Sequence, residues 1–515
     1  MKSKLKVLKN NFSDLHGRLV TGLECLENKQ FIEAQSIFLD ILKAQPSNAE
    51  LLHLTGITCF EIKDFETAIQ YYERSIKLNS KNGRVMYHLG LALYELNFLE
   101  EALAQYDQAI ALNFIEWNVF NNRSAILFEL HRINDSLVDV NKAIALNPNQ
   151  CEIYTNKGNV SYAQHKLDDA LANFEKSILL NPNDPNAHWG YAQALLQAGE
   201  YQKGFSEYEW RYKNPKLAGV FPEQFYTPQW SGEDLKNKTL LILSEQGLGD
   251  SLQFIRYIKK IKELGAEIIL SVDEPLIELF RESADVFKVI VKGGKDIPQH
   301  DFYCRLLSLP FIFNTTLETI PNEVPYLKCN EDKKQAWHKK LGLKNKPRIG
   351  LVWSGGFRPN DPKLKLVNQR RNIPLEKFSR LKDLDIEIYS LQKGDNAVLE
   401  LKDLILSNWD GPKVIDYTSE LNNFSDTAAF IENLDLLIAV DTSTAHLAGA
   451  LNKPVWILNR YDNCWRWMLE RSDSPWYPSA TIFRQNSPEN WDSVIQDVKK
   501  ALINKFKLEP ELLCP

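Results

Sequence analysis

The stretch DLLIAVDTSTAHLAGALNKPVWILN, residues 435–459, predicts a strand, a helix and a second strand in succession. Residues 436–440 form a continuous apolar run, which is typical of a parallel strand buried on both faces. Residues 441–444 are short and polar, and residues 445–451 are small enough for a helix that lies close to a sheet. An Asn-Lys-Pro break precedes the second strand at 455–458. Because free N–H groups at a helix start favour anions, we expect the diphosphate of a ligand here.

The length and composition predict an ordinary soluble protein of two or three domains. A chain of 515 residues is too long for one core. Its 61 basic and 67 acidic residues leave a net charge of −6, so no global field favours nucleic acid. The seven cysteines include no CxxC pair, which fits a reducing compartment and gives no metal-ligand spacing. No apolar run reaches 18 residues, and the start lacks the pattern of a signal peptide. We expect a cytoplasmic protein with no metal, no cofactor, no transmembrane segment and no nucleic-acid partner.

The first half of the chain carries an internal repeat of 34 residues. A small residue recurs at that spacing at Ala34, Ala68, Ala102, Ser136, Ala170 and Gly204. A larger residue follows each by four positions, at Phe38, Tyr72, Tyr106, Val140, Phe174 and Tyr208. Another small residue precedes each by twelve, at Gly22, Gly56, Gly90, Ser124, Gly158 and Ala192. Small residues at fixed points let two antiparallel helices approach, while the larger residue fills the gap to the next pair.

This pattern closely resembles the tetratricopeptide repeat over residues 13–212. The resemblance implies an all-α solenoid of about six repeats, spanning residues 1–212, whose concave groove takes a protein or peptide. The alternative is a solenoid that acts only as a spacer or a dimer surface. The aromatic run YEWRY at 208–212 is expected to cap the open core and to pack on the second half of the chain. Residues 213–238 have no clear period, and we expect them to form an ordered linker.

Strands and helices alternate in the second half. Apolar runs predict strands at 239–243, 267–272, 287–291 and 301–307, with helices at 251–264 and 275–281. After a connecting region at 323–346, further strands are predicted at 348–353, 386–391 and 413–417, with helices at 375–384 and 425–434. This alternation indicates parallel sheets. The predicted fold class is therefore α + α/β, with two α/β domains at 239–335 and 336–515 that face each other across a cleft.

A glycine-rich turn, QGLGD at residues 246–250, follows the first of these strands. It lacks the third glycine of a dinucleotide-binding fingerprint and the Gly-Lys-Ser/Thr of a Walker loop. We interpret the glycines as permitting a tight strand-to-helix turn that presents Asp250 to the cleft. Capping of the following helix is an equally good interpretation of Asp250.

Six segments of the second half together resemble the heptosyltransferase-type glycosyltransferases of the GT-B fold, and specifically bacterial relatives with N-terminal tetratricopeptide repeats. The segments are SEQGLGDSLQFIRY (244–257), GLVWSGG (350–356), NQRRNIPL (368–375), SLQKG (390–394), DTAAFIENLDLLIAVDTSTAHLAGALNKPVW (426–456) and SPWYPSATIFRQ (474–485). A weaker resemblance runs to O-linked N-acetylglucosamine transferases. The resemblance, which covers about residues 239–502, implies two Rossmann-like domains: an acceptor-side domain at 239–335 and a nucleotide-sugar-binding domain at 336–515.

The resemblance implies an inverting sugar transfer that is independent of metal. Asp250 matches the family's catalytic base, which takes the proton of the acceptor hydroxyl as its oxygen attacks the anomeric carbon. Charge on the leaving nucleoside diphosphate must then meet N–H groups and cations. The expected substrate-binding residues are Gly249, Ser354, Gly355, Arg371, Gln392, Lys393, Asp441, Thr442, Ser443, Thr444 and His446.

These residues have different expected roles. Arg371 matches the basic residue that the family places near the phosphates, and Lys393 is a second candidate cation. The turn at 441–444 would supply N–H donors, Asp441 would accept hydrogen bonds from sugar hydroxyls, and His446 would orient the sugar or a phosphate. Relatives carry Arg-Ser where Asn372 follows Arg371 here, which leaves the local geometry open.

Each candidate also has a plainer interpretation. Ser443 can simply cap its helix, and His446 can be a satisfied core histidine. Lys393 and Arg370 can be solvated surface charges. The C-terminal aromatic residues fit the core or the wall of the cleft better than a base-stacking platform: Trp465, Trp467, Trp476 and Tyr477.

The resemblance leaves the substrates open. The donor can be an ADP-, UDP- or GDP-linked sugar, and the transferred group can be a hexose, a heptose or an N-acetylhexosamine. We expect a protein or glycan acceptor, with the repeats recruiting the acceptor or a partner. One alternative is a non-catalytic repeat scaffold with a relic GT-B domain. Another is an enzyme acting on a lipid-linked saccharide, although no basic amphipathic stretch supports it.

Overall fold

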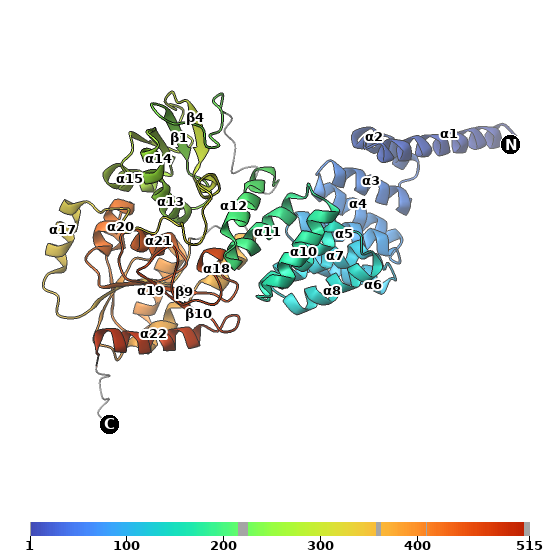
Figure 1. The fold of residues 1–515 in the computed structure, drawn as a ribbon. Coiled ribbons are helices and arrows are strands. Elements are labelled where there is room, and N and C mark those ends of the chain that lie inside the picture. The colour runs from blue at the N-terminus through green and yellow to red at the C-terminus, as the bar shows by residue number, and fades with distance from the viewer. Residues whose placement is uncertain (1, 215–224, 357–361, 408, 509–515) are drawn as a thin grey trace. The chain divides into compact units, whose positions relative to one another are not determined.

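The computed structural model describes residues 2–214, 225–356, 362–407 and 409–508. It has an all-helical repeat array followed by a region of parallel sheets and helices, which confirms the predicted α + α/β fold class (Figure 1). Compactness divides the chain into two units, residues 1–166 with 175–182, and residues 167–174 with 183–515. The 34-residue pattern continues past this division, so its last helix pair belongs to the unit that holds the sheets.

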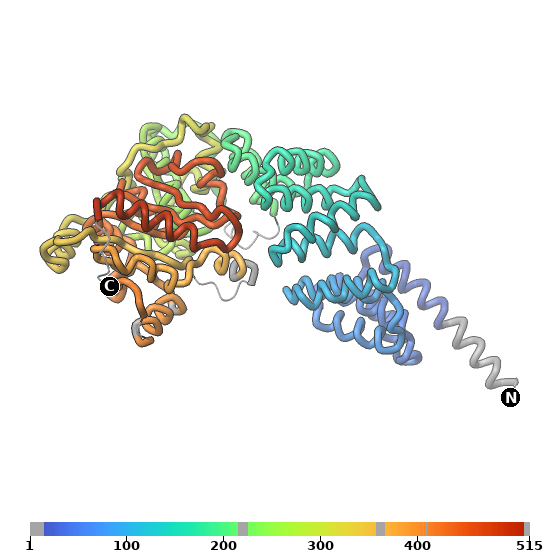
Figure 2. The backbone as a smooth tube through the Cα atoms, turned by 90° about the horizontal axis from the view of Figure 1, so that it is seen from below, coloured from blue at the N-terminus to red at the C-terminus, as the bar shows by residue number. Residues whose placement is uncertain are grey.

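The first helices of the repeat array pack against one another in sequence order. They are α1 (Lys2–Glu27), α2 (Phe31–Ala44), α3 (Ala49–Glu61), α4 (Phe65–Leu78), α5 (Gly83–Glu95), α6 (Leu99–Ala111), α7 (Trp117–Glu129), α8 (Ile133–Leu146) and α9 (Cys151–Ala163), and α10 (Leu167–Leu180) comes next in the chain. Each of the helices α1 to α8 contacts the next one in the chain, and Figure 2 shows the blue and cyan helices of this array packed beside one another. The repeat positions pack as predicted, because a Cβ added to Gly56 or Gly90 would lie within 2.6 Å of the ring of Tyr72 or Tyr106.

A ladder of polar side chains joins the first helices of neighbouring repeats. Each pair spans 35 residues, one repeat plus one position, and so links α3 to α5, α5 to α7 and α7 to α9. The pairs are His53 with His88 at 2.7 Å, Tyr87 with Asn122 at 3.2 Å, and Asn121 with Asn156 at 2.9 Å. Because these partners are buried or partly buried, their hydrogen bonds offset the cost of removing them from water.

We predict that the histidine pair of this ladder makes the solenoid sensitive to acid. Burial lowers the pKa of His53 to about 4 and that of His88 to about 3. Both rings therefore stay neutral in the folded repeats, while the unfolded chain takes up protons below about pH 6.5. Stability is present above that pH and is lost as the pH falls toward 4, by roughly 2 kcal/mol for each ring at pH 5.

Urea unfolding at pH 7.5 and pH 5 measures this loss. The double variant His53→Asn/His88→Asn is the control, because it lacks both titrating rings and should lose less stability between the two pH values. Equal pH dependence in the variant and the wild type would contradict the prediction.

Among the described residues, the first sheet has four parallel strands in the order β3-β2-β1-β4. The strands are β1 (Thr239–Leu243), β2 (Glu267–Val272), β3 (Lys288–Val291) and β4 (Phe302–Arg305). Its helices are α13 (Leu248–Phe254), η3 (Ile255–Tyr257), α14 (Ile258–Glu263), η4 (Glu274–Leu276), α15 (Ile277–Ser283), η5 (Leu306–Ser308) and α16 (Leu309–Ile312). The central strand β1 is almost wholly buried and ends shortly before the glycine-rich turn.

The second sheet has six parallel strands among the described residues, in the order β10-β9-β8-β5-β6-β7. The strands are β5 (Arg348–Val352), β6 (Glu387–Ser390), β7 (Val414–Asp416), β8 (Leu436–Val440), β9 (Val455–Asn459) and β10 (Ala480–Arg484). Its helices are α17 (Glu331–Leu341), α18 (Pro362–Arg371), η6 (Leu375–Leu381), α19 (Asp395–Leu406), η7 (Thr418–Glu420), α20 (Phe424–Ile431), α21 (Ser443–Ala450), η8 (Trp465–Trp467) and α22 (Trp491–Phe506). Every residue of β5, β8 and β9 is buried, as expected for central parallel strands.

Several predicted elements need correction. The helix predicted at 251–264 starts at Leu248 instead and is interrupted by η3, so Asp250 lies in its first turn. The helix predicted at 375–384 is the shorter 3₁₀ helix η6, and the connecting region at 323–346 contains α17. Helices α18 and α19 were not predicted. Helix α18 is strongly polar and has no apolar period.

The last repeat pair packs on the first sheet within the same compact unit, as predicted for the run at 208–212, because Tyr208 lies in one hydrophobic core with Leu240 and Ile242. The pair consists of α11 (Pro185–Ala198), α12 (Tyr201–Tyr208) and η1 (Glu209–Lys213). Tyr201 stacks on Trp476 with ring centres 5.7 Å apart and accepts a hydrogen bond from its indole at 3.2 Å. In the predicted linker, residues 215–224 lie outside the described residues. Trp230 is buried, and its backbone N–H donates to the Tyr303 carbonyl at 2.7 Å.

Candidate functional site

The carboxyl ends of β1 and β8 meet through the starts of the helices that come after them. Helix α13 starts two residues after Gln246, and α21 starts directly after Thr442. A Cβ on Gly249 would lie 2.8 Å from Cδ2 of His446 and 3.6 Å from Cα of Ser443. The two predicted motifs, GLGD and DTST, therefore lie in contact.

We predict that Gly249→Ala destabilises this junction. The His446 ring cannot move aside, because it is buried against Trp467 and Tyr477 with ring centres 5.4 and 5.6 Å away. Overpacking of this kind costs about 1–3 kcal/mol. Chemical unfolding measures the loss, with Gly356→Ala as the matched control, because no atom lies within 4 Å of a Cβ added there. Equal stability of the two variants would contradict the prediction.

Asp250 lies at this junction in an ion pair with Arg466. Arg466 comes from η8, and its Nε donates to Oε1 of Gln253 at 2.7 Å. Its guanidinium also lies 4.4 Å from the centre of the Trp465 ring, a cation–π distance. The arginine is 7% exposed. A buried cation held from three sides thus faces the predicted catalytic carboxylate.

The second oxygen of Asp250 completes the helix start. Oδ2 accepts the backbone N–H of Gly247 at 2.9 Å. Gly247 is the N-cap residue of α13, so Asp250 is not the N-cap itself and instead caps the helix start from its third helical position. Burial raises the pKa of Asp250, while the Arg466 charge and the Gly247 N–H oppose that increase. Its assignment as a catalytic base stays a prediction that is compatible with this geometry, since a carboxylate has lone pairs beyond these two contacts.

The DTST turn forms the other side of the junction. Helix α21 starts at Ser443, so Thr442 occupies the N-cap position, and no side-chain cap bond is formed there. Ser443 is therefore not the N-cap residue. Nη1 of Arg371 donates to the Asp441 carbonyl at 3.0 Å, which brings the predicted phosphate-binding cation to this turn. Thr444, like its three predecessors, is partly buried.

The loop after β5 lies beside Arg371 and is fixed by side-chain amides. Oε1 of Gln392 accepts the N–H groups of Trp353 and Ser354 at 3.0 and 2.8 Å. Oδ1 of Asn372 accepts the N–H of Gly355 at 2.8 Å, so the residue that departs from the family pattern holds this loop. A Cβ on Gly355 would overlap the guanidinium of Arg371, which explains the need for glycine at that position.

Three other candidate residues are bound to groups of the protein itself. The ammonium of Lys393 donates to the Thr418 carbonyl at 2.5 Å, on the β7 side of β6. Arg370 is not a solvated charge, because it forms an ion pair with Asp462 at 3.0 Å. Nδ1 of His446 bonds the Tyr477 hydroxyl at 2.8 Å, and burial lowers the histidine pKa to about 4. At neutral pH this ring is uncharged and part of the core.

Sequence reasoning missed Arg466 and Gln253. Arg466 is 216 positions from Asp250 and belongs to no predicted motif. The one available signal was its position between two tryptophans, in the WRW run at 465–467. Trp465, Trp467, Trp476 and Tyr477 are all buried, which agrees with their predicted place in the core or a wall.

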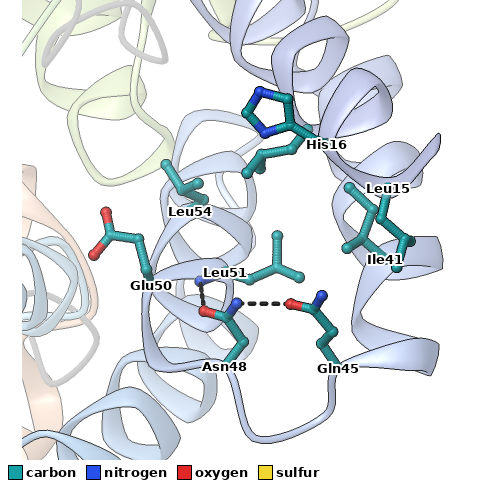
Figure 3. Close-up of a pocket in the computed structure, with 9 residues that line it drawn as sticks. Leu15, His16, Ile41, Gln45, Asn48, Glu50, Leu51 and Leu54 are labelled. Carbon is teal, nitrogen blue, oxygen red and sulfur yellow. Dashed lines mark hydrogen bonds between the residues drawn. The ribbon is translucent and has the colours of Figure 1, made fainter. Parts of the chain in front are cut away.

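The solenoid has a small pocket between its first helices (Figure 3). It measures about 210 Å³ and has apolar walls from Leu15, Ile41 and Leu51. Its amides are already engaged, because Asn48 accepts the N–H of Leu51 and donates to Gln45. His16 and Glu50 are the charged or titratable residues that line it.

The described part of the chain offers neither a metal cluster nor a membrane-spanning helix. In residues 2–214, 225–356, 362–407 and 409–508, no cluster of three His, Cys, Asp or Glu side chains is arranged to hold a metal ion. Over the same residues, no helix combines the length and the apolar character needed to cross a bilayer.

Comparison with known proteins identifies the repeats. Residues 21–83, 63–113 and 155–212 match the tetratricopeptide repeat family, so the N-terminal region contains tetratricopeptide repeats. A curated relative is Protein FlbA of Caulobacter vibrioides, which is 27% identical over 333 residues. The match covers 60% of this chain and 54% of FlbA, so the chain spans about half the length of that relative.

Several solved structures are similar to part of this chain at low identity. MamA is 22% identical and covers 31% of this chain and 94% of its own, with a TM-score of 0.29. YrrB, described as a TPR protein with an unusual peptide-binding site, is 17% identical, covering 35% and 95% with a TM-score of 0.30. Pseudomonas aeruginosa PilF is 16% identical, covering 40% and 93% with a TM-score of 0.36.

Proposed function

We propose that the unit with the two sheets is an inverting, metal-independent glycosyltransferase of the GT-B type, and that the repeats recruit its protein or glycan acceptor or a partner. A nucleotide sugar is the donor. Asp250 takes the proton of the acceptor hydroxyl, while the start of α21 and Arg371 bind the diphosphate that leaves. The starts of α13 and α21 meet at the carboxyl ends of their strands, where ligands of α/β proteins bind.

The observation that carries this proposal is the junction around Asp250. A carboxylate whose pKa is raised by burial lies there beside a buried arginine and a helix start. Raised carboxylate pKa values bring a general base closer to working pH. Helix N–H groups and arginines favour phosphate oxygens. The combination provides both a base and an anion site within one small region.

Buried polar atoms around the junction give further support. Within the described residues, Oγ1 of Thr442, Nε2 of Gln253 and Nε1 of Trp467 are buried and have no hydrogen-bond partner. An unsatisfied buried polar atom costs about 1–3 kcal/mol, and a ligand that bonds to it recovers part of that cost. A nucleotide sugar, with its many hydroxyl and phosphate oxygens, would supply the partners.

Calorimetric titration tests the donor site. We expect one of ADP, UDP and GDP to bind the full chain in a buffer without added metal. The base that binds identifies the donor class. Binding of none of the three would contradict the proposed donor site and favour the non-catalytic scaffold.

A further inference from the structure

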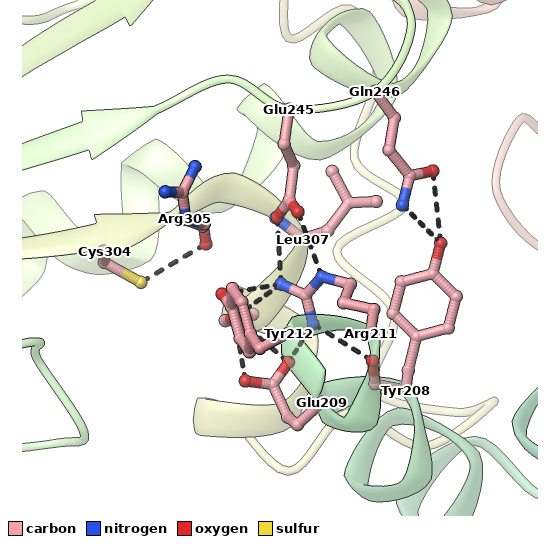
Figure 4. A network of polar contacts seen from close by, with 10 residues as sticks. Tyr208, Glu209, Arg211, Tyr212, Glu245, Gln246, Cys304, Arg305 and Leu307 are labelled. Atoms are coloured by element: carbon pink, nitrogen blue, oxygen red, sulfur yellow. Dashed lines mark hydrogen bonds and ion pairs between the residues drawn. The ribbon is translucent and has the colours of Figure 1, made fainter. Parts of the chain in front are cut away.

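Helix η1, which ends the last repeat, is bound by a network of buried charges to the loop between β1 and α13, the helix of Asp250 (Figure 4). Arg211 of η1 is fully buried, and Glu245, directly after β1 and Ser244, is 1% exposed. The guanidinium makes a bidentate contact with this carboxylate, with Nε to Oε2 at 3.0 Å and Nη2 to Oε1 at 2.9 Å. Both groups lie in the same compact unit of the chain.

The remaining groups of the network find partners within η1 and in η5. Nη2 of Arg211 also donates to Tyr212 at 2.9 Å and to Ser308 at 2.7 Å, and Nη1 forms an ion pair with Glu209. Oε1 of Glu245 accepts the N–H of Leu307 at 3.1 Å. Because the charges are paired and bonded on all sides, the network fixes its members in one arrangement.

A second contact holds the next residue of the loop. The Tyr208 hydroxyl and the Gln246 amide bond each other, with Nε2 to Oη at 2.9 Å. Gln246 has a φ of 58°, a left-handed conformation that costs energy for a residue with a side chain. The tyrosine therefore holds this residue in a conformation that it would not adopt freely.

The peptide group after Gln246 connects these contacts to Asp250. Gly247 comes directly after Gln246, and its N–H donates to Oδ2 of Asp250 at 2.9 Å. The direction of that N–H depends on the backbone of Glu245 and Gln246. We infer that Arg211 and Tyr208 are positioning residues, through which the last repeat helix sets the orientation of the Asp250 carboxylate. This inference rests on the proposed function for its catalytic consequence.

The test compares Arg211→Met with the double variant Arg211→Met/Glu245→Gln. The single variant leaves a buried carboxylate without its arginine, whereas the double variant removes both charges and should recover stability. In both, we expect kcat to fall at least tenfold with the donor KM within about twofold, because orientation and not donor binding is lost. The acid limb of the pH profile should move to higher pH as the Gly247 N–H ceases to stabilise the carboxylate.

Hydrogen exchange separates this inference from the proposed function. In both variants, the amides of residues 244–251 should exchange faster than in the wild type, whether or not the protein transfers a sugar. Arg348→Met is the matched control, since Arg348 is 2% exposed and lies at the start of β5 in the same unit. It should lower the melting temperature without faster exchange at 244–251. Wild-type exchange there in a folded Arg211→Met/Glu245→Gln variant would overturn the inference.

Discussion

Replacing Asp250 with Asn is expected to reduce sugar transfer by about 10²- to 10⁴-fold and to leave donor affinity within about threefold. The amide keeps the size of the carboxylate but cannot take a proton from an acceptor hydroxyl. Because the diphosphate is assigned to α21 and Arg371, the nucleotide should still bind. Release of nucleoside diphosphate measures the first quantity, and calorimetry measures the second.

Stability must be controlled in this experiment, because Asn removes the charge that pairs with Arg466. An unpaired buried charge is strongly destabilising, whereas removal of both partners is often tolerated. The double variant Asp250→Asn/Arg466→Gln should therefore fold and remain inactive. The control variant is Asp301→Asn, which should keep wild-type activity. Asp301 accepts the backbone N–H of Thr239 at the amino end of β1, the end of that strand away from Asp250. Wild-type turnover by folded Asp250→Asn would remove Asp250 from the mechanism.

Replacing Arg371 with Ala is expected to weaken nucleoside diphosphate binding roughly ten- to hundredfold. A hydrogen bond to a charged group contributes about 1.5–3 kcal/mol, and about 1.4 kcal/mol corresponds to a factor of ten. Arg371→Lys should bind with intermediate affinity, since an ammonium keeps the charge but loses the planar fork. Calorimetric titration of the three proteins with the preferred nucleotide measures the series.

The neighbouring residue provides the control for the arginine series. Arg370 pairs with Asp462, so Arg370→Ala removes an arginine from the same helix end without touching the Asp441 turn. Its affinity should stay within about twofold of the wild type. Equal effects of the Arg370 and Arg371 substitutions would show that general charge, and not the specific cation, determines binding.

The sequence predicted strands and repeats well because their patterns are local. The first two strands and the strand at 436–440 have the predicted boundaries, since each is an apolar run closed by polar or turn residues. The repeat series located the small and aromatic contacts of the solenoid, as Gly56 and Tyr72 show. Such patterns depend on periodicity alone and require no knowledge of distant contacts.

The site was predictable only in part, because its members meet through tertiary folding. Asp250, Arg371 and the DTST turn were found through motifs in the chain, and the structure brings them to one region. Arg466 was not found, because it belongs to no predicted motif. Arg211 was noted only as part of the run at 208–212, and its pairing with Glu245 was not predicted. Helix α18, which carries Arg371, was missed for lack of an apolar period.

The most direct test of the central claim is turnover by the full wild-type chain. ADP-, UDP- and GDP-linked sugars are each incubated with the protein and with protein and glycan acceptors, in buffer without added metal. We expect one donor to release its nucleoside diphosphate, with the sugar appearing on the acceptor by mass spectrometry. If no donor released its nucleotide and no sugar reached an acceptor, the account would be contradicted. The repeats would then be the functional part of the molecule.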